Sequence, residues 1–125
     1  MSGATYEREL KSLLTKQGWL VFRSAGSFAC DLIALKPNDH KLIEVKSTKA
    51  NNANLNHDDK ARAQFDILNN LAKEGFNVYY YIRWKRRKPK WSKYQLPLEP
   101  YPILKHKNIK EENKCQDIIE QVQED

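Results

Sequence analysis

The stretch DLIALKPNDHKLIEVKS, residues 31–47, decides the fold of this chain. Its two halves, 31–36 and 41–47, are rich in β-prone apolar residues, and Pro37-Asn38-Asp39-His40 separates them. Because proline and asparagine favour tight turns, this pattern predicts two strands joined as a β-hairpin.

Further helices and strands are predicted on both sides of this hairpin. Apolar residues at helical spacing, each series ended by a glycine, indicate helices over residues 4–17 and 58–74. Short β-prone runs indicate strands over 19–23, 77–84 and 91–96. The sequence therefore predicts an α/β domain with a central mixed five-stranded sheet flanked by helices.

The remaining segments are polar or rich in proline. Residues 48–57 are Asn-rich and are expected to form a mobile loop, and three prolines interrupt regular structure between residues 97 and 102. We expect the domain to occupy residues 1–102 and residues 103–125 to form a charged C-terminal tail or a short helix.

Charge gives the first indication of function. The 125 residues include 22 Lys and Arg against 16 Asp and Glu, a net charge of +6. Residues 111–125 hold one Lys and six acidic residues, which leaves 21 basic and 10 acidic residues in 1–110. A basic body with an acidic tail is typical of a protein that binds a polyanion such as nucleic acid, although a merely soluble surface is the alternative.

Several classes of protein are disfavoured by the composition. No apolar run approaches the roughly 20 residues that span a bilayer, and no secretory signal is visible in residues 1–11. Cys30 and Cys115 lie far apart and outside any Cys/His cluster, which argues against structural zinc. We therefore expect a cytoplasmic protein with reduced thiols and no membrane association.

The hairpin also carries a candidate metal site. Asp31 begins one strand and Glu44 lies on the other, with Lys46 two residues later and on the same face. Neighbouring carboxylates repel each other unless a cation lies between them, and oxygen ligands suit Mg²⁺ or Mn²⁺. The carbonyl of Val45 could add another ligand. The alternative is an ordinary exposed Glu/Lys pair on an amphipathic strand.

Two other segments could contribute to the same site. Glu7 falls on the apolar face of the first helix, where an ionised carboxylate is costly unless paired or bound to metal. Its alternative is a solvated residue near a frayed helix start. Arg23 and the hydroxyl groups of Ser24 and Ser27 could bind a phosphate, although an ordinary turn is the better interpretation of this loop taken alone.

Taken together, these motifs resemble one family. YEREL at 6–10, RSAGS at 23–27, DLIA at 31–34 and IEVKS at 43–47 have the order and spacing found in archaeal Holliday-junction resolvases. That family belongs to the PD-(D/E)xK nucleases, so the resemblance implies a restriction-endonuclease-like fold. Similar proteins are encoded by some archaeal viruses, and the short chain would suit such an origin.

The resemblance assigns roles residue by residue. It implies Mg²⁺, replaceable by Mn²⁺, as the cofactor, and Lys46 and Ser27 as catalytic residues beside the metal-binding carboxylates. The implied metal ligands, the carboxylates being catalytic as well, are Glu7, Asp31, Glu44 and Val45. The implied DNA-binding residues are Arg8, Arg23, Ser24 and Gln64. Cys30 replaces the motif's proline at a position that does not bind metal.

The expected function is metal-dependent cleavage of four-way DNA junctions by a homodimer, since two symmetric strands must be cut. The family's dimer contact suggests five apolar candidates, although core packing is the better interpretation for any single one: Leu68, Leu71, Tyr79, Tyr81 and Trp84. One alternative is a nuclease of the same fold that acts on other branched or single-stranded DNA. The other is a non-catalytic nucleic-acid-binding module.

Overall fold

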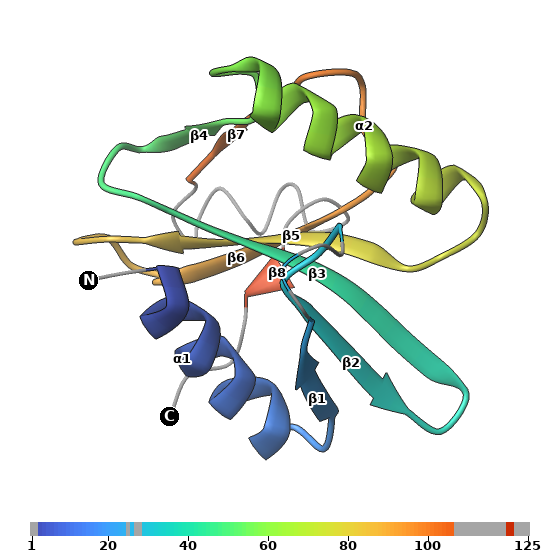
Figure 1. Ribbon diagram of the computed structural model, residues 1–125. Helices are drawn as coiled ribbons and strands as arrows, with labels where there is room; N and C mark the ends of the chain where they lie inside the picture. The colour runs from blue at the N-terminus through green and yellow to red at the C-terminus, as the bar shows by residue number, and fades with distance from the viewer. Residues whose placement is uncertain (1–2, 25, 27–28, 107–119, 122–125) are drawn as a thin grey trace.

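The computed structural model describes residues 3–24, 26, 29–106 and 120–121. A mixed β-sheet lies between two helices, with α1 on one face and α2 on the other (Figure 1). The elements follow the order α1 (Gly3–Lys16), β1 (Leu20–Arg23), β2 (Leu32–Lys36), β3 (Asp39–Thr48), β4 (Asn52–Asn54), α2 (Asp59–Lys73), β5 (Val78–Trp84), β6 (Trp91–Gln95), β7 (Ile103–Lys105) and β8 (Glu120–Gln121).

The main sheet has the strand order β1-β2-β3-β5-β6-β8. Strands β3 and β5 are parallel, with α2 in the crossover between them, and the other neighbours are antiparallel. The predicted mixed five-stranded sheet is confirmed by β1, β2, β3, β5 and β6. The two-residue β8 adds a sixth strand at the edge of β6.

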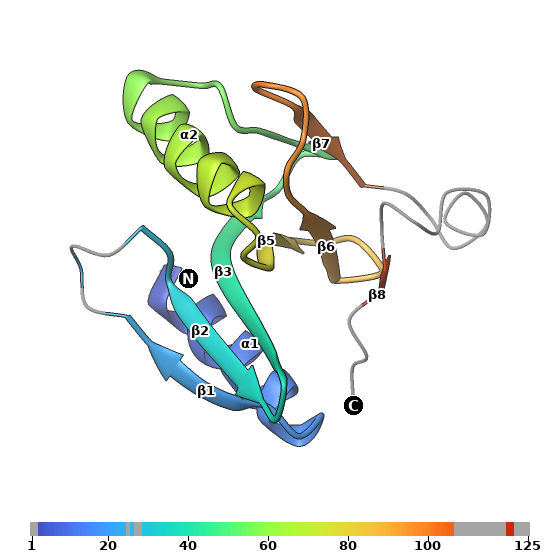
Figure 2. The same cartoon turned by 90° about the vertical axis from the view of Figure 1, so that its right-hand side faces the viewer.

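The central hairpin forms as expected. Strands β2 and β3 pair antiparallel from Lys36 opposite Asp39 to Leu32 opposite Ile43. Pro37 and Asn38 make the turn, and Asn38 has a positive φ of 62°, a conformation that asparagine tolerates better than most residues. Figure 2 shows this hairpin with β1 as an arm that extends away from α2.

Strand β3 divides its side chains between two hydrophobic cores. Ile43 packs in the core under α1, with Tyr6, Leu10 and Leu14 of that helix. Leu42 packs on the opposite face, against the core under α2. Because side chains alternate along a strand, Glu44 and Lys46 lie on the α2 face with Leu42.

The ends of α2 are fixed by local interactions. Asp58 is the N-cap, and its Oδ1 accepts a 2.7 Å hydrogen bond from the amide nitrogen of Ala61. Gly75 follows the helix with a φ of 111°, which glycine adopts without steric cost. Both ends therefore lie within a residue or so of the predicted bounds, and the helix presents Phe65 and Leu68 to the core.

A small second sheet appears where the sequence predicts none. Strand β4 lies within the expected loop 48–57, and it pairs with β7, which follows the three prolines. Leu104 of β7 joins the core under α2, and the Tyr94 hydroxyl donates to the carbonyl of Lys105 at 2.8 Å. The chain just beyond the expected boundary at residue 102 thus packs on the domain. Most of the expected helix or tail lies outside the described residues.

Three of the five candidate dimer residues are core residues of a single subunit. Leu68, Tyr81 and Trp84 are each at most 1% exposed, so none of them can meet a second copy. Leu71 and Tyr79 are partly buried against the same two cores. Neither helix in the described part of the chain is long and apolar enough to cross a membrane.

Candidate active site

Asp31 is joined to the backbone of β3 by two hydrogen bonds. Its amide nitrogen donates to the carbonyl of Ile43 at 2.9 Å, and its Oδ2 accepts from the amide nitrogen of Val45 at 2.9 Å. The second bond places the carboxylate at the edge of β3, one residue beyond the point where β2 pairing ends.

The carbonyl of Val45 lies on the same edge. In a strand, the N–H and C=O groups of one residue point to the same side. Because the N–H of Val45 points toward Asp31, its carbonyl does so too, and no residue of β2 lies opposite it. Asp31 and Val45 therefore present oxygen atoms on one side of the strand.

Glu44 is a buried carboxylate with an unusual environment. It is 4% exposed, and its Oε1 has no hydrogen-bond partner among the described residues. Burial, and secondarily the nearby charge of Asp31, raises the pKa of Glu44 to about 8, although Lys46 opposes the shift. A buried carboxylate that lacks a partner for one oxygen is costly, and a cation would relieve that cost.

Lys46 is held between the carboxylate and α2. Its Nζ lies 3.3 Å from Oε2 of Glu44 and donates to Oε1 of Gln64, also at 3.3 Å. The Nε2 of Gln64 donates in turn to the carbonyl of Ala29 at 3.1 Å. Gln64 therefore fixes the ammonium group of Lys46 and anchors the chain just before Asp31.

The donor set fits a hard divalent cation. Asp31 and Glu44 offer carboxylate oxygens and Val45 offers a carbonyl oxygen, which are the ligands that Mg²⁺ and Mn²⁺ prefer. The described residues contain no group of three or more His, Cys, Asp or Glu side chains that could hold a metal ion. The carboxylate contribution thus consists of a pair, and water or other oxygen ligands would complete the shell.

Glu7 is engaged elsewhere in this structure. Its Oε1 lies 3.2 Å from the Nη2 of Arg23 and accepts a 3.3 Å hydrogen bond from the Nε of the same side chain. The structure therefore brings the predicted residues Glu7 and Arg23 together, but it does not group Glu7 with Asp31 and Glu44. Arg8, the next residue of α1, is exposed.

The loop after β1 is only partly described. The Ser24 hydroxyl donates to the carbonyl of Cys30, and its amide nitrogen donates to the carbonyl of Asp31 at 3.0 Å. The hydrogen bond of the Ser24 hydroxyl thus joins the two ends of the loop that precedes Asp31. Ser27, which the sequence suggested as a catalytic residue, lies outside the described residues.

Tyr80 is a site residue that the sequence analysis missed. It lies opposite Glu44 in the parallel pairing of β3 and β5, on the same face of the sheet. Burial raises the pKa of its hydroxyl, and the charges of Glu44 and Asp31 add to the shift. Only the register between two distant strands reveals this neighbour, because residues 79–81 read simply as a β-prone run of tyrosines.

Comparison with known proteins now decides the family. The family model for archaeal Holliday junction resolvase (Hjc) matches residues 1–95, about three quarters of the chain and all of the site described above. The chain belongs to the archaeal Holliday junction resolvase family.

Two relatives illustrate this family membership. The crossover junction endodeoxyribonuclease Hjc of Methanocaldococcus jannaschii is 42% identical over 57 residues, which are 46% of this chain and 43% of that protein. The match thus spans less than half of the relative's length. The solved structure of Archaeoglobus fulgidus Hjc, a Holliday junction resolvase, matches 82% of this chain and 88% of that one, with a TM-score of 0.64 and 24% identity. At that identity the structural match supports the resolvase fold.

Proposed function

We propose that this protein is a structure-selective endonuclease that resolves four-way DNA junctions by Mg²⁺-dependent phosphodiester hydrolysis. One observation carries the proposal. The partly buried carboxylate of Asp31 and the buried carboxylate of Glu44 lie together near the ammonium group of Lys46, and Oε1 of Glu44 lacks a partner among the described residues. A metal bound there would sit next to a cationic side chain, the arrangement that a phosphodiesterase needs.

Asp31, Glu44 and the carbonyl of Val45 would hold the Mg²⁺, and Mn²⁺ could replace it. When bound, the ion supplies Lewis-acid stabilisation of a phosphate and acidifies a water ligand. Glu7 would join this site if its carboxylate left Arg23. The released guanidinium would then be free to bind a DNA phosphate.

Lys46 and Gln64 act together. The ammonium group of Lys46 neutralises charge on the scissile phosphate and orients the attacking water. Gln64 holds that ammonium group in place through its 3.3 Å contact and limits its motion toward solvent. Arg8, which is exposed on α1, would contact the DNA backbone outside the reacting centre.

An exposed apolar surface on the β1–β2 arm is suited to bind a second copy. We define this arm face by Leu20, Phe22, Leu35 and Phe76, of which Leu20 is 60% and Phe22 49% exposed. Leu20 lies opposite Leu35, Leu35 lies opposite His40, and the His40 ring contacts the Phe76 ring edge-on at 6.1 Å. Cross-strand partners share a face of a sheet, so these side chains form one continuous row.

The arm face is the same face of the sheet that carries Glu44 and Lys46. Phe22 lies opposite Ile33, which lies opposite Leu42, and Leu42 shares its face with Glu44. A two-fold dimer formed through this face would present two active sites to the two symmetric strands of a junction. The proposed partners are therefore branched DNA and a second subunit. The proposed location is the interior of the cell, where DNA is found.

The decisive experiment compares DNA substrates. The protein is incubated with an end-labelled four-way junction, a flap, a single strand and a linear duplex of the same sequence, with Mg²⁺ or with EDTA. Paired cuts in the junction that require Mg²⁺ would support the proposal. Preferred cleavage of the flap or single strand would favour the broader nuclease, and binding without cleavage would favour a non-catalytic module.

A further inference from the structure

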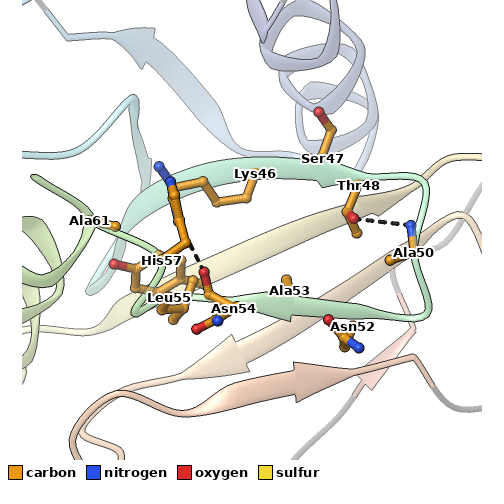
Figure 3. Close-up of a pocket in the computed structure, with 11 residues that line it drawn as sticks. Lys46, Ser47, Thr48, Ala50, Asn52, Ala53, Asn54, Leu55, His57 and Ala61 are labelled. Atoms are coloured by element: carbon orange, nitrogen blue, oxygen red, sulfur yellow. Dashed lines mark hydrogen bonds between the residues drawn. The ribbon is translucent and has the colours of Figure 1, made fainter. Parts of the chain in front are cut away.

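A cavity of about 310 Å³ lies directly beside the candidate active site. It is open to solvent on one side and is bounded by the end of β3, by β4 and by the chain that leads into α2, and the residues that line it include Lys46, Thr48, Asn52, Asn54 and His57 (Figure 3). Tyr80 also lines it. The volume falls near the lower end of ligand sites, which span roughly 300–1,000 Å³.

The lining has a consistent chemical character. Among the described residues that form the cavity there is no Asp or Glu, whereas Lys46 contributes a positive charge. The amides of Asn52 and Asn54 can each donate and accept hydrogen bonds, and Leu55 adds an apolar surface. Such a lining disfavours a free cation and suits a neutral, planar group with polar edges that is attached to an anion.

Tyr80 adds a hydrogen-bonding group to the cavity wall. The residue is 1% exposed, yet none of the described residues forms a hydrogen bond with its hydroxyl. Because Tyr80 lines the cavity, its hydroxyl is placed to donate a hydrogen bond to a group that enters the cavity.

The cavity also has a fixed relation to the reacting phosphate. Tyr80 lies opposite Glu44 in the sheet, and Lys46 belongs to both the carboxylate pair and the cavity wall. A phosphate bound at Glu44 and Lys46 would therefore have a neighbouring nucleoside of its own strand at the mouth of the cavity.

From these relationships we infer that the cavity binds one unpaired nucleotide of the cleaved strand, next to the scissile phosphate. This inference rests on the proposed nuclease function and extends it to substrate selection. Moving a base out of its stack costs the least free energy where stacking is already interrupted, as it is at a branch point. The cavity would thus favour a junction over intact duplex, with Asn52 and Asn54 contacting the edge of the base.

The test uses 2-aminopurine, a base whose fluorescence rises when it leaves the stack. After the cut site in the junction has been mapped, the probe is placed on its 5′ side in one junction and on its 3′ side in another. Wild-type protein in EDTA should raise the fluorescence severalfold at one of these positions. An unchanged signal at both positions would overturn the inference.

Substitutions of residues that line the cavity test whether the fluorescence rise depends on the cavity. Asn52→Leu and Tyr80→Phe should each diminish the fluorescence rise and slow single-turnover cleavage at saturating protein by about tenfold, the loss expected for one base contact. The matched control is Asn70→Leu, because Asn70 is exposed on α2 and does not line the cavity. Cleavage by both cavity variants at the control rate would contradict the inference. Failure of the wild type to cut any junction would instead reject the proposed function, and the probe would then be placed at each nucleotide next to the branch point, so that the fluorescence still reports on the cavity.

Discussion

The amide nitrogen of Val45 donates a 2.9 Å hydrogen bond to Oδ2 of Asp31, which fixes one carboxylate of the site to the strand that carries the other. Glu44 precedes Val45 and is buried, so the two carboxylates cannot move apart without breaking the start of the hairpin. This rigidity keeps the two carboxyl groups close in the folded protein, so that ionising both of them without a cation is costly. It is the structural basis of the metal requirement that we propose.

The first prediction concerns these carboxylates. Asp31→Asn and Glu44→Gln should each reduce Mg²⁺-dependent junction cleavage by more than about 100-fold, because each removes an anionic metal ligand. Binding of the junction in EDTA should be unchanged or tighter, since less negative charge faces the phosphates. Gel-shift and cleavage assays of the same preparations measure both. Cleavage near the wild-type rate by either variant would refute the assignment.

The second prediction concerns pH and the stability of the metal-free protein. Glu44 has a pKa of about 8 when folded against an ordinary value of 4.5. Between these pH values the folded protein keeps a proton that the unfolded chain releases, so the free energy of unfolding should fall as pH rises from 4.5 toward 8. Since one pKa unit corresponds to about 1.4 kcal/mol, the loss should amount to a few kcal/mol.

Urea unfolding in EDTA at several pH values measures this effect. Glu44→Gln cannot lose the proton, so its stability should depend less on pH, and the difference between the two proteins isolates Glu44. Addition of Mg²⁺ should stabilise the wild type more at pH 8 than at pH 5, because metal binding must displace the proton at low pH. Parallel pH profiles for wild type and variant would show that Glu44 does not titrate in this range.

The sequence predicts the hairpin and its two faces well because both depend on local patterns. The turn at Pro37-Asn38 and the alternation along residues 41–47 act within a few residues of the chain. The β4–β7 pair was missed because Asn52 pairs with Lys105, which lies far from it in the sequence, and because an Asn-rich segment has low β propensity.

The residues of the site also fall into those that a local sequence pattern places and those that only tertiary contacts place. Asp31, Glu44 and Lys46 are placed by one hairpin, so their proximity follows from the strand pattern. The resemblance gave Gln64 only as a DNA-binding residue, and its contact with Lys46 was not predicted, because that contact depends on how α2 packs on the sheet. The neighbour Tyr80, and the pairing of Glu9 with Arg83 at 2.9 Å, arise from tertiary contacts that no local pattern shows.

The third prediction concerns Glu7. If this carboxylate leaves Arg23 to join the metal, Glu7→Gln should lower cleavage by about tenfold or more and leave thermal stability nearly unchanged, because an ion pair whose arginine is exposed contributes little to folding. Glu9→Gln is a useful comparison, since Glu9 accepts hydrogen bonds from both Arg83 and Trp91. That variant should lose stability while the cleavage rate of its folded fraction is retained. Full activity in Glu7→Gln would show that Glu7 has no role in cleavage and serves only to pair with Arg23.

The fourth prediction concerns the arm face. Phe22→Lys places a charge in the exposed apolar row and should convert a dimer to a monomer, which sedimentation equilibrium would show. Ile103→Lys is the matched control, because Ile103 is 54% exposed on β7 and lies outside the arm face. The monomer should cut one strand at a time and so accumulate nicked junctions. A dimer that survives Phe22→Lys would place the contact elsewhere.

The central claim is that Asp31, Glu44 and Lys46 form a metal-dependent site that cuts branched DNA. The most direct measurement is the single-turnover cleavage rate of a labelled four-way junction and its matched linear duplex, with Mg²⁺ and with EDTA, by wild type and Lys46→Ala. We expect junction cleavage by the wild type only when Mg²⁺ is present, little cleavage of duplex, and a loss of more than about 100-fold in Lys46→Ala. Equal cleavage of the two substrates, cleavage in EDTA, or an active Lys46→Ala variant would contradict it.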